Sequence, residues 1–309
     1  MAHLIITNCT SRKRDIGIDP LLPRFDKTGS MHDALTAWVE RVNSSKIVVA
    51  PFDLYQGRSI SECRLASRRL SAGLYVVSAG LGLVSSNDLI PNYSLTISEG
   101  TGSIQSWLAL QNSTPADWWI QLCQAFGTPN PISKIVSSMS TNDKVLVALP
   151  GRYIQMIASD LALIDPKQHL NLRLFTSISG SKVLPDALKS VVMPYDERLE
   201  GIAQHNGTRS DFPQRAMKHF VTHLQAEECP LEEAKYLVAS AMENSQLRVN
   251  PTRTKASDDQ IAELILGNWK VYGGSATKLL RFLRDDAKVA CEQSRFSGIW
   301  RKVMAQQIK

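Results

Sequence analysis

Three clusters of polar residues in the first hundred positions each follow a hydrophobic run typical of a β-strand. These residues are Asn8, Ser11 and Lys13 after the run 4–6, Tyr55, Gly57 and Arg58 after 47–50, and Ser78, Gly80, Gly82, Asp88 and Tyr93 after 74–77. In an open α/β sheet, ligands bind in the crevice beyond the carboxyl ends of the strands. The three clusters therefore predict one pocket, and an enzyme is the leading interpretation.

The side chains of the first two clusters suit a nucleotide. The Asn8 amide can pair with the edge of a base, whereas the Ser11 hydroxyl and the Lys13 ammonium group suit phosphate. Tyr55 and Arg58 add an aromatic face and a planar cation, which together would stack on and clamp an extruded base. The alternatives are an ordinary strand-to-loop turn for the first cluster and a solvated helix face for Arg58.

Asp88 is the acidic residue nearest the third strand end, so it is the first candidate for catalysis. A carboxylate there would orient a water molecule or stabilise a cationic sugar, as in glycoside hydrolysis. Asn8 and Asp196 are the other two catalytic candidates. Asp88 equally fits a surface loop, and Asp196 equally fits an internal ion pair with Arg198.

Two glycines and a later segment extend the predicted substrate-binding site. Gly80 and Gly82 place no side chain at the strand end, which lets a ligand approach the backbone amides. Gly151, Arg152 and Tyr153 follow the fourth clear strand and would complete the same crevice.

The sequence predicts neither a cofactor nor a metal. Ser85 stands where the dinucleotide-binding fingerprint requires its third glycine, and the chain has no GxxxxGK[ST] phosphate loop. His219 and His223 are four residues apart on a predicted helix, but Phe220 breaks the HExxH pattern. The five cysteines are scattered without a CxxC pair, which disfavours a disulfide framework and a structural zinc site.

The elements that must position these residues alternate between strand and helix, which predicts an α/β fold with a mostly parallel sheet flanked by helices. The predicted strands are 4–8, 46–50, 74–78, 143–149, 170–176 and 190–193. The predicted helices are 31–43, 58–71, 103–126, 131–140, 152–163, 210–224, 231–244, 257–268, 275–286 and 292–305. A turn at Gly273-Gly274 between two of the last three helices predicts a small helix-turn-helix-like C-terminal region.

The excess of positive over negative charge lies mostly in that C-terminal region. The net charge is +6, and residues 251–309 hold 11 Lys and Arg against 6 Asp and Glu. We predict an α/β catalytic domain at 1–224, a helical connection and linker at 225–250, and a basic helical region at 251–309 that binds double-stranded DNA. The residues predicted to bind nucleic acid are Arg209, Lys278, Arg281, Arg284 and Arg295.

The sequence predicts a cytoplasmic protein that does not enter a membrane. No apolar run approaches the roughly 20 residues that cross a bilayer. The chain starts directly with a predicted strand and lacks the basic-then-apolar layout of a secretory signal.

The ordered clusters resemble a known family, the YaaA-like and phage-associated proteins whose core is similar to uracil-DNA glycosylases. The matching residues are Cys9, Ser11, Lys13, Leu54, Tyr55, Gly57, Arg58, Ser78, Ala79, Gly80, Gly82, Leu83, Pro91 and Tyr93. The resemblance covers about the first hundred residues and implies a nucleic-acid or modified-base context in phage–host conflict. The chain has neither the Gly-Gln-Asp-Pro-Tyr-His nor the His-Pro-Ser-Pro loop of uracil-DNA glycosylases, so their catalytic residues do not carry over.

Together these observations favour a DNA base N-glycosylase that excises a modified base, including a glucosylated one, from phage DNA as antiviral defence. The expected product is an abasic site without strand scission, because no lysine stands out in the sequence as a lyase residue. The alternatives are a non-catalytic DNA-binding sensor, or a nucleotide or nucleoside hydrolase or transferase.

Overall fold

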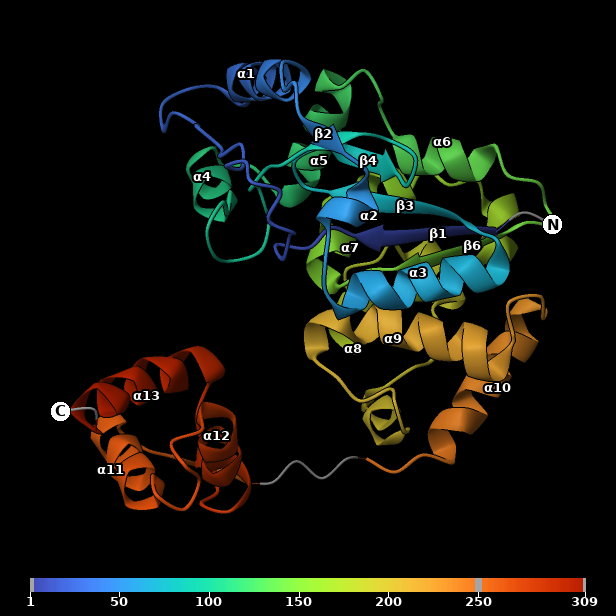
Figure 1. Ribbon diagram of the computed structural model, residues 1–309. Coiled ribbons are helices and arrows are strands. Elements are labelled where there is room, and N and C mark those ends of the chain that lie inside the picture. Colours follow the sequence, from blue (N-terminus) through green and yellow to red (C-terminus); the bar gives the residue numbers. More distant parts are fainter. Residues whose placement is uncertain (1–2, 248–251, 308–309) are drawn as a thin grey trace. The chain divides into compact units, whose positions relative to one another are not determined.

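The computed structural model describes residues 3–247 and 252–307, and the chain divides into two compact units (Figure 1). The first unit is Met1–Leu247 and the second is Arg248–Lys309. Each unit has its own cluster of buried apolar side chains. Helix α10, Leu231–Glu243, packs in the first unit and not in a separate connection.

The first unit is built on a five-stranded sheet in the order β4-β3-β1-β6-β7. Its strands are β1 His3–Asn8, β3 Gly73–Ser78, β4 Gly82–Ser85, β6 Lys144–Ala148 and β7 Leu172–Phe175. β1 pairs in parallel with β3 and with β6, and β6 pairs in parallel with β7, whereas β4 runs antiparallel to β3. All six residues of β1 are buried, as expected for a central strand of a parallel sheet that is covered on both faces.

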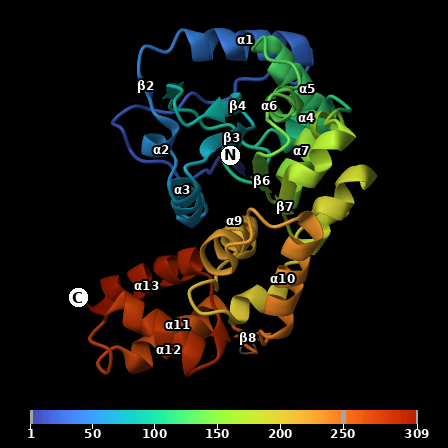
Figure 2. The ribbon, with the colours of Figure 1, turned by 90° about the vertical axis from the view of Figure 1, so that its right-hand side faces the viewer.

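Helices cover both faces of this sheet, which confirms the predicted α/β class. α3 and α9 lie on one face, and α5 and α7, with α1 and α6 beside them, lie on the other (Figures 1 and 2). The helices of the first unit before α10 are α1 Met31–Asn43, α2 Pro51–Leu54, α3 Arg58–Leu70, α4 Gln105–Leu110, α5 Pro115–Ala125, α6 Pro131–Ser137, α7 Gly151–Leu161, α8 Ile178–Ser181 and α9 Phe212–His219.

Two predicted strands are not strands of the main sheet. Of the run 46–50, β2 contains Val48–Val49, which pairs antiparallel with β5, Ile90–Pro91, in a separate two-stranded ribbon. Ile47 is exposed and Pro51 starts helix α2, so the apolar run is too short to enter the sheet. Of the segment predicted as strand 190–193, the first two residues end a 3-10 helix, Asp186–Val191, and Val192 forms a single parallel bridge to Leu174 of β7. The pairing does not continue as a ladder, because Pro194 has no backbone N–H to donate.

Two predicted helices differ at their boundaries. The stretch 103–126 forms two helices, because Asn112 adopts a left-handed backbone and Thr114 caps a new helix at Pro115. Thr208, not Ser210, makes the capping box before α9, with Asp211 as its partner.

In the described part of the second unit, residues 252–307, three helices surround a small core, as its apolar periodicity predicts. α11 is Asp258–Asn268, α12 is Ala276–Asp285 and α13 is Gln293–Gln307. Ile261, Ile265, Leu279 and Leu283 are fully buried between them. Two short strands, β8 Thr254–Lys255 and β9 Val289–Ala290, pair in parallel in this unit. The sequence did not predict them, because a strand of two residues is too short to show periodicity. Within the described residues, no helix has the length and apolar character needed to span a bilayer.

Candidate active site

The topology of the sheet places a switch point between β1 and β6. The chain leaves β1 for β3 on one side, and it leaves β6 for β7 on the other side. Loops that diverge in this way leave a crevice outside the carboxyl ends of the two strands, where open α/β sheets bind their ligands. Cys9 follows β1 directly, and α7 with Tyr153 follows β6.

A cavity of about 370 Å³ lies at this position, within the range of roughly 300–1,000 Å³ typical of small-molecule sites. Of the residues predicted to bind substrate, Ser11, Lys13, Tyr93 and Tyr153 line it. Both the loop after β1 and the segment after β5 contribute to its wall, and Tyr153 closes it from the β6 side. The structure thus brings together parts of the first and third predicted clusters and of the later segment 151–153.

Lys13 is held in this cavity by aromatic residues. Its ammonium nitrogen lies 3.4 Å from the centroid of the Tyr93 ring and 5.7 Å from that of Tyr55, and it donates a hydrogen bond to the Tyr93 carbonyl oxygen. Burial lowers the pKa of Lys13 from 10.5 to about 8, with the Cys9 thiol acting in the opposite direction. At neutral pH, a measurable fraction of the Lys13 side chain is therefore the neutral amine.

A buried chain of hydroxyl groups fixes the Tyr93 ring. The Tyr93 hydroxyl lies 2.6 Å from the Tyr55 hydroxyl and 2.6 Å from the Ser78 hydroxyl. Ser78 in turn accepts hydrogen bonds from the backbone N–H groups of Gly80 and Leu81. Burial raises the pKa of both tyrosines well above 10, so both remain neutral donors and acceptors. Tyr55 and Ser78 thus support the pocket from behind and do not line it.

The turn at Gly80 requires the absence of a side chain. A Cβ atom on Gly80 would lie 2.9 Å from two carbons of the Tyr93 ring. Trp38 and Trp118 donate their indole N–H groups to the carbonyl oxygens of Gly80 and Ala79, at 2.6 and 2.8 Å. The glycine therefore serves the packing of Tyr93 and does not open the backbone to a ligand.

Cys9 and Tyr153 meet at the β1–β6 side of the cavity. The Cys9 sulfur lies 3.2 Å from the Tyr153 hydroxyl, and only a few per cent of the surface of each residue is exposed. Burial raises the pKa of Tyr153 well above 10. Tyr153 is thus a neutral hydroxyl at the wall of the pocket.

Two acidic residues that the sequence analysis passed over also line the cavity. Asp15 and Asp19 lie in the loop after Lys13, and both are exposed at the mouth. One Asp15 carboxylate oxygen accepts a hydrogen bond from the Gly17 backbone N–H at 2.8 Å. The signal in the sequence is their position in the same polar segment as Ser11 and Lys13, directly after the first strand.

The structure does not bring the three predicted catalytic residues into this cavity. Asp88 lies at the end of the strands opposite to the cavity, because β4 runs back along β3 so that Ser85 pairs with Tyr75. The Asp88 carboxylate accepts a hydrogen bond from the Ser85 N–H at 2.7 Å. Asn8 is buried and accepts a hydrogen bond from Gln214 at 2.9 Å. Asp196 forms an ion pair with Arg198 at 2.6 Å, which is the alternative that the sequence left open.

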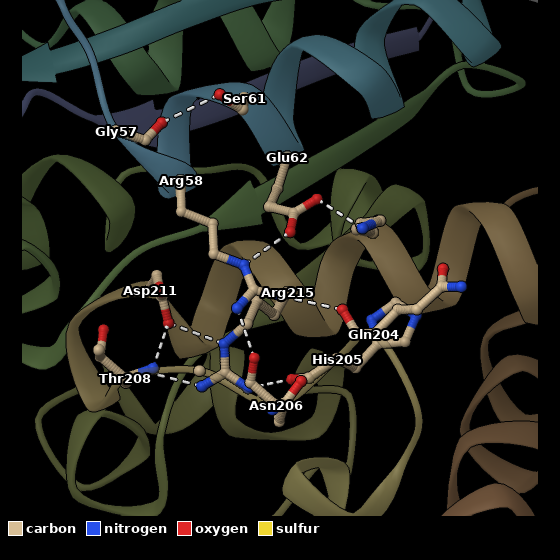
Figure 3. A network of polar contacts seen from close by, with 12 residues as sticks. Gly57, Arg58, Ser61, Glu62, Gln204, His205, Asn206, Thr208, Asp211 and Arg215 are labelled. Atoms are coloured by element: carbon tan, nitrogen blue, oxygen red, sulfur yellow. Dashed lines mark hydrogen bonds and ion pairs between the residues drawn. The ribbon is translucent and has the colours of Figure 1, made fainter. Parts of the chain in front are cut away.

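Arg58 joins a network that connects helix α3 to the segment before α9 (Figure 3). Its guanidinium group bonds to the Glu62 carboxylate at 2.9 Å, to the Gln204 carbonyl oxygen at 2.9 Å and to the Asn206 carbonyl oxygen. The neighbouring Arg215 is fully buried. Its guanidinium contacts are Asp211 and Glu200, each at 2.7 Å, and the carbonyl oxygens of His205 and Thr208. Arg58 therefore acts in packing two elements together and does not line the cavity.

The remaining residues predicted to bind substrate lie outside the cavity and have roles in the backbone, in packing or in a surface ion pair. Gly57 precedes α3 with a φ of 107°, which favours glycine. Gly82 starts β4 with a φ of 76°, and Gly151 packs against the backbone of Gly180. Arg152 forms an ion pair with Glu99 at 2.9 Å on the surface.

A second, cationic cavity of about 640 Å³ lies in the second unit. Four basic residues line it, Arg253, Lys255, Arg284 and Arg295, together with one acid, Glu292. Two of them are among the predicted nucleic-acid-binding residues. Arg284 bonds to the Cys291 carbonyl oxygen, and Arg295 bonds to Asp258 and to the Ala256 carbonyl oxygen.

The other predicted nucleic-acid-binding residues lie outside this cavity. Lys278 and Arg281 are exposed on α12, and Arg281 is 3.7 Å from Asp285. Arg209 belongs to the first unit, where it is exposed in the 3-10 helix Arg209–Asp211.

Three histidines cluster on the side of the sheet that α9 covers. The ring centroids of His205, His219 and His223 lie 4.6–5.3 Å apart. Burial lowers the pKa of His205 to about 3 and that of His219 to about 4, with charge repulsion from the neighbouring histidines as a further cause. Among the described residues, no group of three or more His, Cys, Asp or Glu side chains has an arrangement that could hold a metal ion.

Comparison with known proteins provides no functional assignment. No family model matches the chain, and neither the curated proteins nor the solved structures include a significant match. The fold and the cavity define an α/β protein with a cavity lined by polar residues at the switch point of its sheet.

Proposed function

We propose that the protein is a DNA base N-glycosylase, which cleaves the bond between a modified base and its deoxyribose. The observation that carries the proposal is that two carboxylates, Asp15 and Asp19, share the switch-point cavity with the Lys13 amine. Hydrolysis of a glycosidic bond needs a carboxylate beside the sugar and a proton source beside the leaving group. The cavity offers both kinds of group.

The lining of the cavity fits a base that carries hydroxyl groups. Five serine and threonine hydroxyl groups line it, those of Thr10, Ser11, Ser94, Thr96 and Thr101, and Asn92 adds an amide. Hydroxyl groups both donate and accept hydrogen bonds, as the hydroxyls of a sugar substituent do. A hydroxymethylated or glucosylated cytosine is therefore the favoured substrate, and the resemblance to phage-associated proteins favours phage DNA as its source.

The chemical step assigns a role to each side of the cavity. A nucleotide extruded from the duplex would enter the cavity, at an unstacking cost of a few kcal/mol. As the bond between C1′ and the base nitrogen breaks, its electron pair leaves with the base and positive charge develops on the sugar. A carboxylate of Asp15 or Asp19 would stabilise that charge and orient the attacking water, while the Lys13 ammonium group donates a proton to the departing base.

The cationic cavity of the second unit supports DNA as the polymer that carries the base. Four basic side chains against one acid favour a phosphate group, and lysine and arginine contacts to phosphate supply most of the salt-sensitive affinity of DNA-binding proteins. Since the second unit contains most of the excess positive charge of the chain, it would grip the duplex while the first unit performs the chemistry.

The test is base release from phage DNA. Purified protein would be incubated with plain phage DNA and with phage DNA that carries glucosylated cytosines, with released bases measured by mass spectrometry and abasic sites by alkaline cleavage. We expect release from the modified DNA, and a loss of at least tenfold in the variants Asp15→Asn or Asp19→Asn. Asp88→Asn is the matched control, because Asp88 lies at the opposite end of the strands from the cavity.

Two results would replace the proposal. Binding to modified DNA without base release would identify a sensor. Release from free modified nucleosides at the same rate as from DNA would identify a nucleoside hydrolase, since the switch-point cavity is lined entirely by residues of the first unit.

A further inference from the structure

We propose that Lys13 forms an imine with the C1′ aldehyde carbon of the abasic deoxyribose, so that the protein holds its product covalently after the base has left. This inference rests on the proposed function, because base excision is the step that generates the aldehyde. It adds an activity to the site that the sequence did not indicate, since no lysine stood out there as a candidate for carbonyl chemistry.

The backbone around Lys13 is fixed by a segment far from it in sequence. Lys13 forms an antiparallel bridge with Tyr55. The flanking residues add two backbone hydrogen bonds, from Arg14 N–H to the Leu54 oxygen at 2.8 Å and from Gln56 N–H to the Arg12 oxygen at 2.9 Å. The loop that carries the amine is therefore preorganised, which reactive side chains require.

The side chain of Lys13 is held by groups that leave its nitrogen reactive. The Tyr93 ring and carbonyl oxygen position the nitrogen, and no ion pair of the described residues includes Lys13. Carboxylate partners would keep a lysine protonated, whereas burial in a site of this kind produces the neutral amine that attacks carbonyl groups. With a pKa of about 8, on the order of one Lys13 side chain in ten is neutral at pH 7.

The proposed reaction follows directly from departure of the base. When Lys13 gives its proton to the leaving base, the nitrogen becomes a neutral amine beside the sugar. After water has added to C1′, the sugar ring opens to the aldehyde, and the nitrogen lone pair attacks C1′ to give a carbinolamine. Loss of one water molecule forms the C=N bond, and addition of water reverses the step and releases the abasic site. No oxidant or reductant is needed.

The test uses a duplex with a preformed abasic site, so that it does not depend on base excision. The full-length protein would be mixed with this duplex and sodium borohydride, which reduces an imine to a stable secondary amine. The covalent complex would be resolved on a denaturing gel, and the modified peptide would be identified by mass spectrometry. We expect an adduct with wild-type protein, mapped to Lys13.

Three variants make the test specific. Lys13→Arg keeps the positive charge without an imine-forming amine, and Lys13→Met removes both, so the adduct should fall at least tenfold in each. Lys134→Arg, at an exposed lysine on α6, should leave adduct formation unchanged. Thermal melting of each variant separates loss of the amine from loss of the fold.

Two results would overturn the inference: no adduct with the wild-type protein, or an adduct that persists in folded Lys13→Arg protein. The outcome is distinguishable from that of the proposed function. Base release without an adduct removes the imine and leaves the glycosylase, whereas an adduct at Lys13 without base release removes the glycosylase and leaves a protein that captures abasic sites.

Discussion

The Lys13 ammonium nitrogen lies 3.4 Å from the centroid of the Tyr93 ring and also donates to the carbonyl oxygen of that residue. A cation over an aromatic face is attracted by the ring quadrupole, by about 0.5–2 kcal/mol depending on solvent exposure. This contact positions the amine without the carboxylate that would keep it protonated. The position of the Tyr93 ring therefore determines where the Lys13 amine lies in the cavity.

Gly80→Ala should displace the Tyr93 ring and with it Lys13. The added Cβ would lie 2.9 Å from the ring, which the hydroxyls of Tyr55 and Ser78 hold in place. We expect a loss of about 1–3 kcal/mol in the free energy of unfolding, as for overpacking in a core, and a fall in base release. Gly73→Ala, at the start of β3, is the control, because its Cβ would meet neighbours at 3.5 Å or more. Equal urea midpoints for the two variants would contradict the role given to Gly80.

Lys13 should titrate well below 10.5, the ordinary value for a lysine. Burial lowers its pKa to about 8, and NMR of reductively ¹³C-methylated protein would show the Lys13 signal with a midpoint near that value. Between pH 8 and 10.5 the unfolded chain binds more protons at Lys13 than the native state does. The free energy of unfolding of the wild type should therefore rise with pH across this window relative to Lys13→Met. A midpoint near 10.5 would show that the side chain is solvated.

Arg58→Ala should destabilise the fold. The variant loses three hydrogen bonds, including those to the carbonyl oxygens of Gln204 and Asn206, and removes one partner of the buried Glu62 carboxylate. We expect a cost of about 1–3 kcal/mol in urea unfolding. Arg68→Ala on the same helix should cost less than about 0.5 kcal/mol, because Arg68 is exposed. Unchanged stability with reduced turnover would restore the substrate-binding role that the sequence suggested for Arg58.

The histidine cluster should make the protein sensitive to acid. Burial holds the pKa of His205 at about 3 and that of His219 at about 4, below the ordinary value of 6.5. From pH 6.5 down to about 4 the unfolded chain binds more protons than the native state, so stability falls as pH falls. Each histidine contributes a slope of up to about 1.4 kcal/mol per pH unit. Urea unfolding at pH 7, 5.5 and 4.5 checks this, and His205→Gln should flatten the slope.

The fold class could be predicted from the sequence because hydrophobic runs and helical periodicity are local signals. The position of Lys13 near the pocket could be predicted for the same reason, since it lies in the loop that follows the buried strand β1. The position of Asp88 was predicted wrongly, because no local pattern in the sequence shows that β4, Gly82–Ser85, runs back along β3. This reversal takes Asp88 to the end of the strands opposite to the cavity. The lowered pKa of Lys13 depends on burial. The Tyr93 ring that packs against its nitrogen is eighty positions away, and contacts of that kind leave no periodic pattern in the sequence.

Lys255 provides the cleanest probe of the proposed binding of DNA by the second unit. It lines the cationic cavity and is exposed. Arg284 and Arg295 also donate hydrogen bonds to backbone carbonyl oxygens, so replacing either of them would disturb the fold. Lys255→Gln should weaken binding to all duplex sequences alike and reduce the slope of log affinity against log salt by about 0.9, the value for one phosphate contact.

The matched control for this variant is Lys270→Gln, an exposed lysine that does not line the cavity. Fluorescence anisotropy with a labelled duplex between low and physiological salt measures both slopes. Because counterion release scales with the number of neutralised phosphates, the slope separates a lost contact from a general loss of charge, which both variants share. Equal slopes for Lys255→Gln, Lys270→Gln and the wild type would show that the cavity does not hold a DNA phosphate.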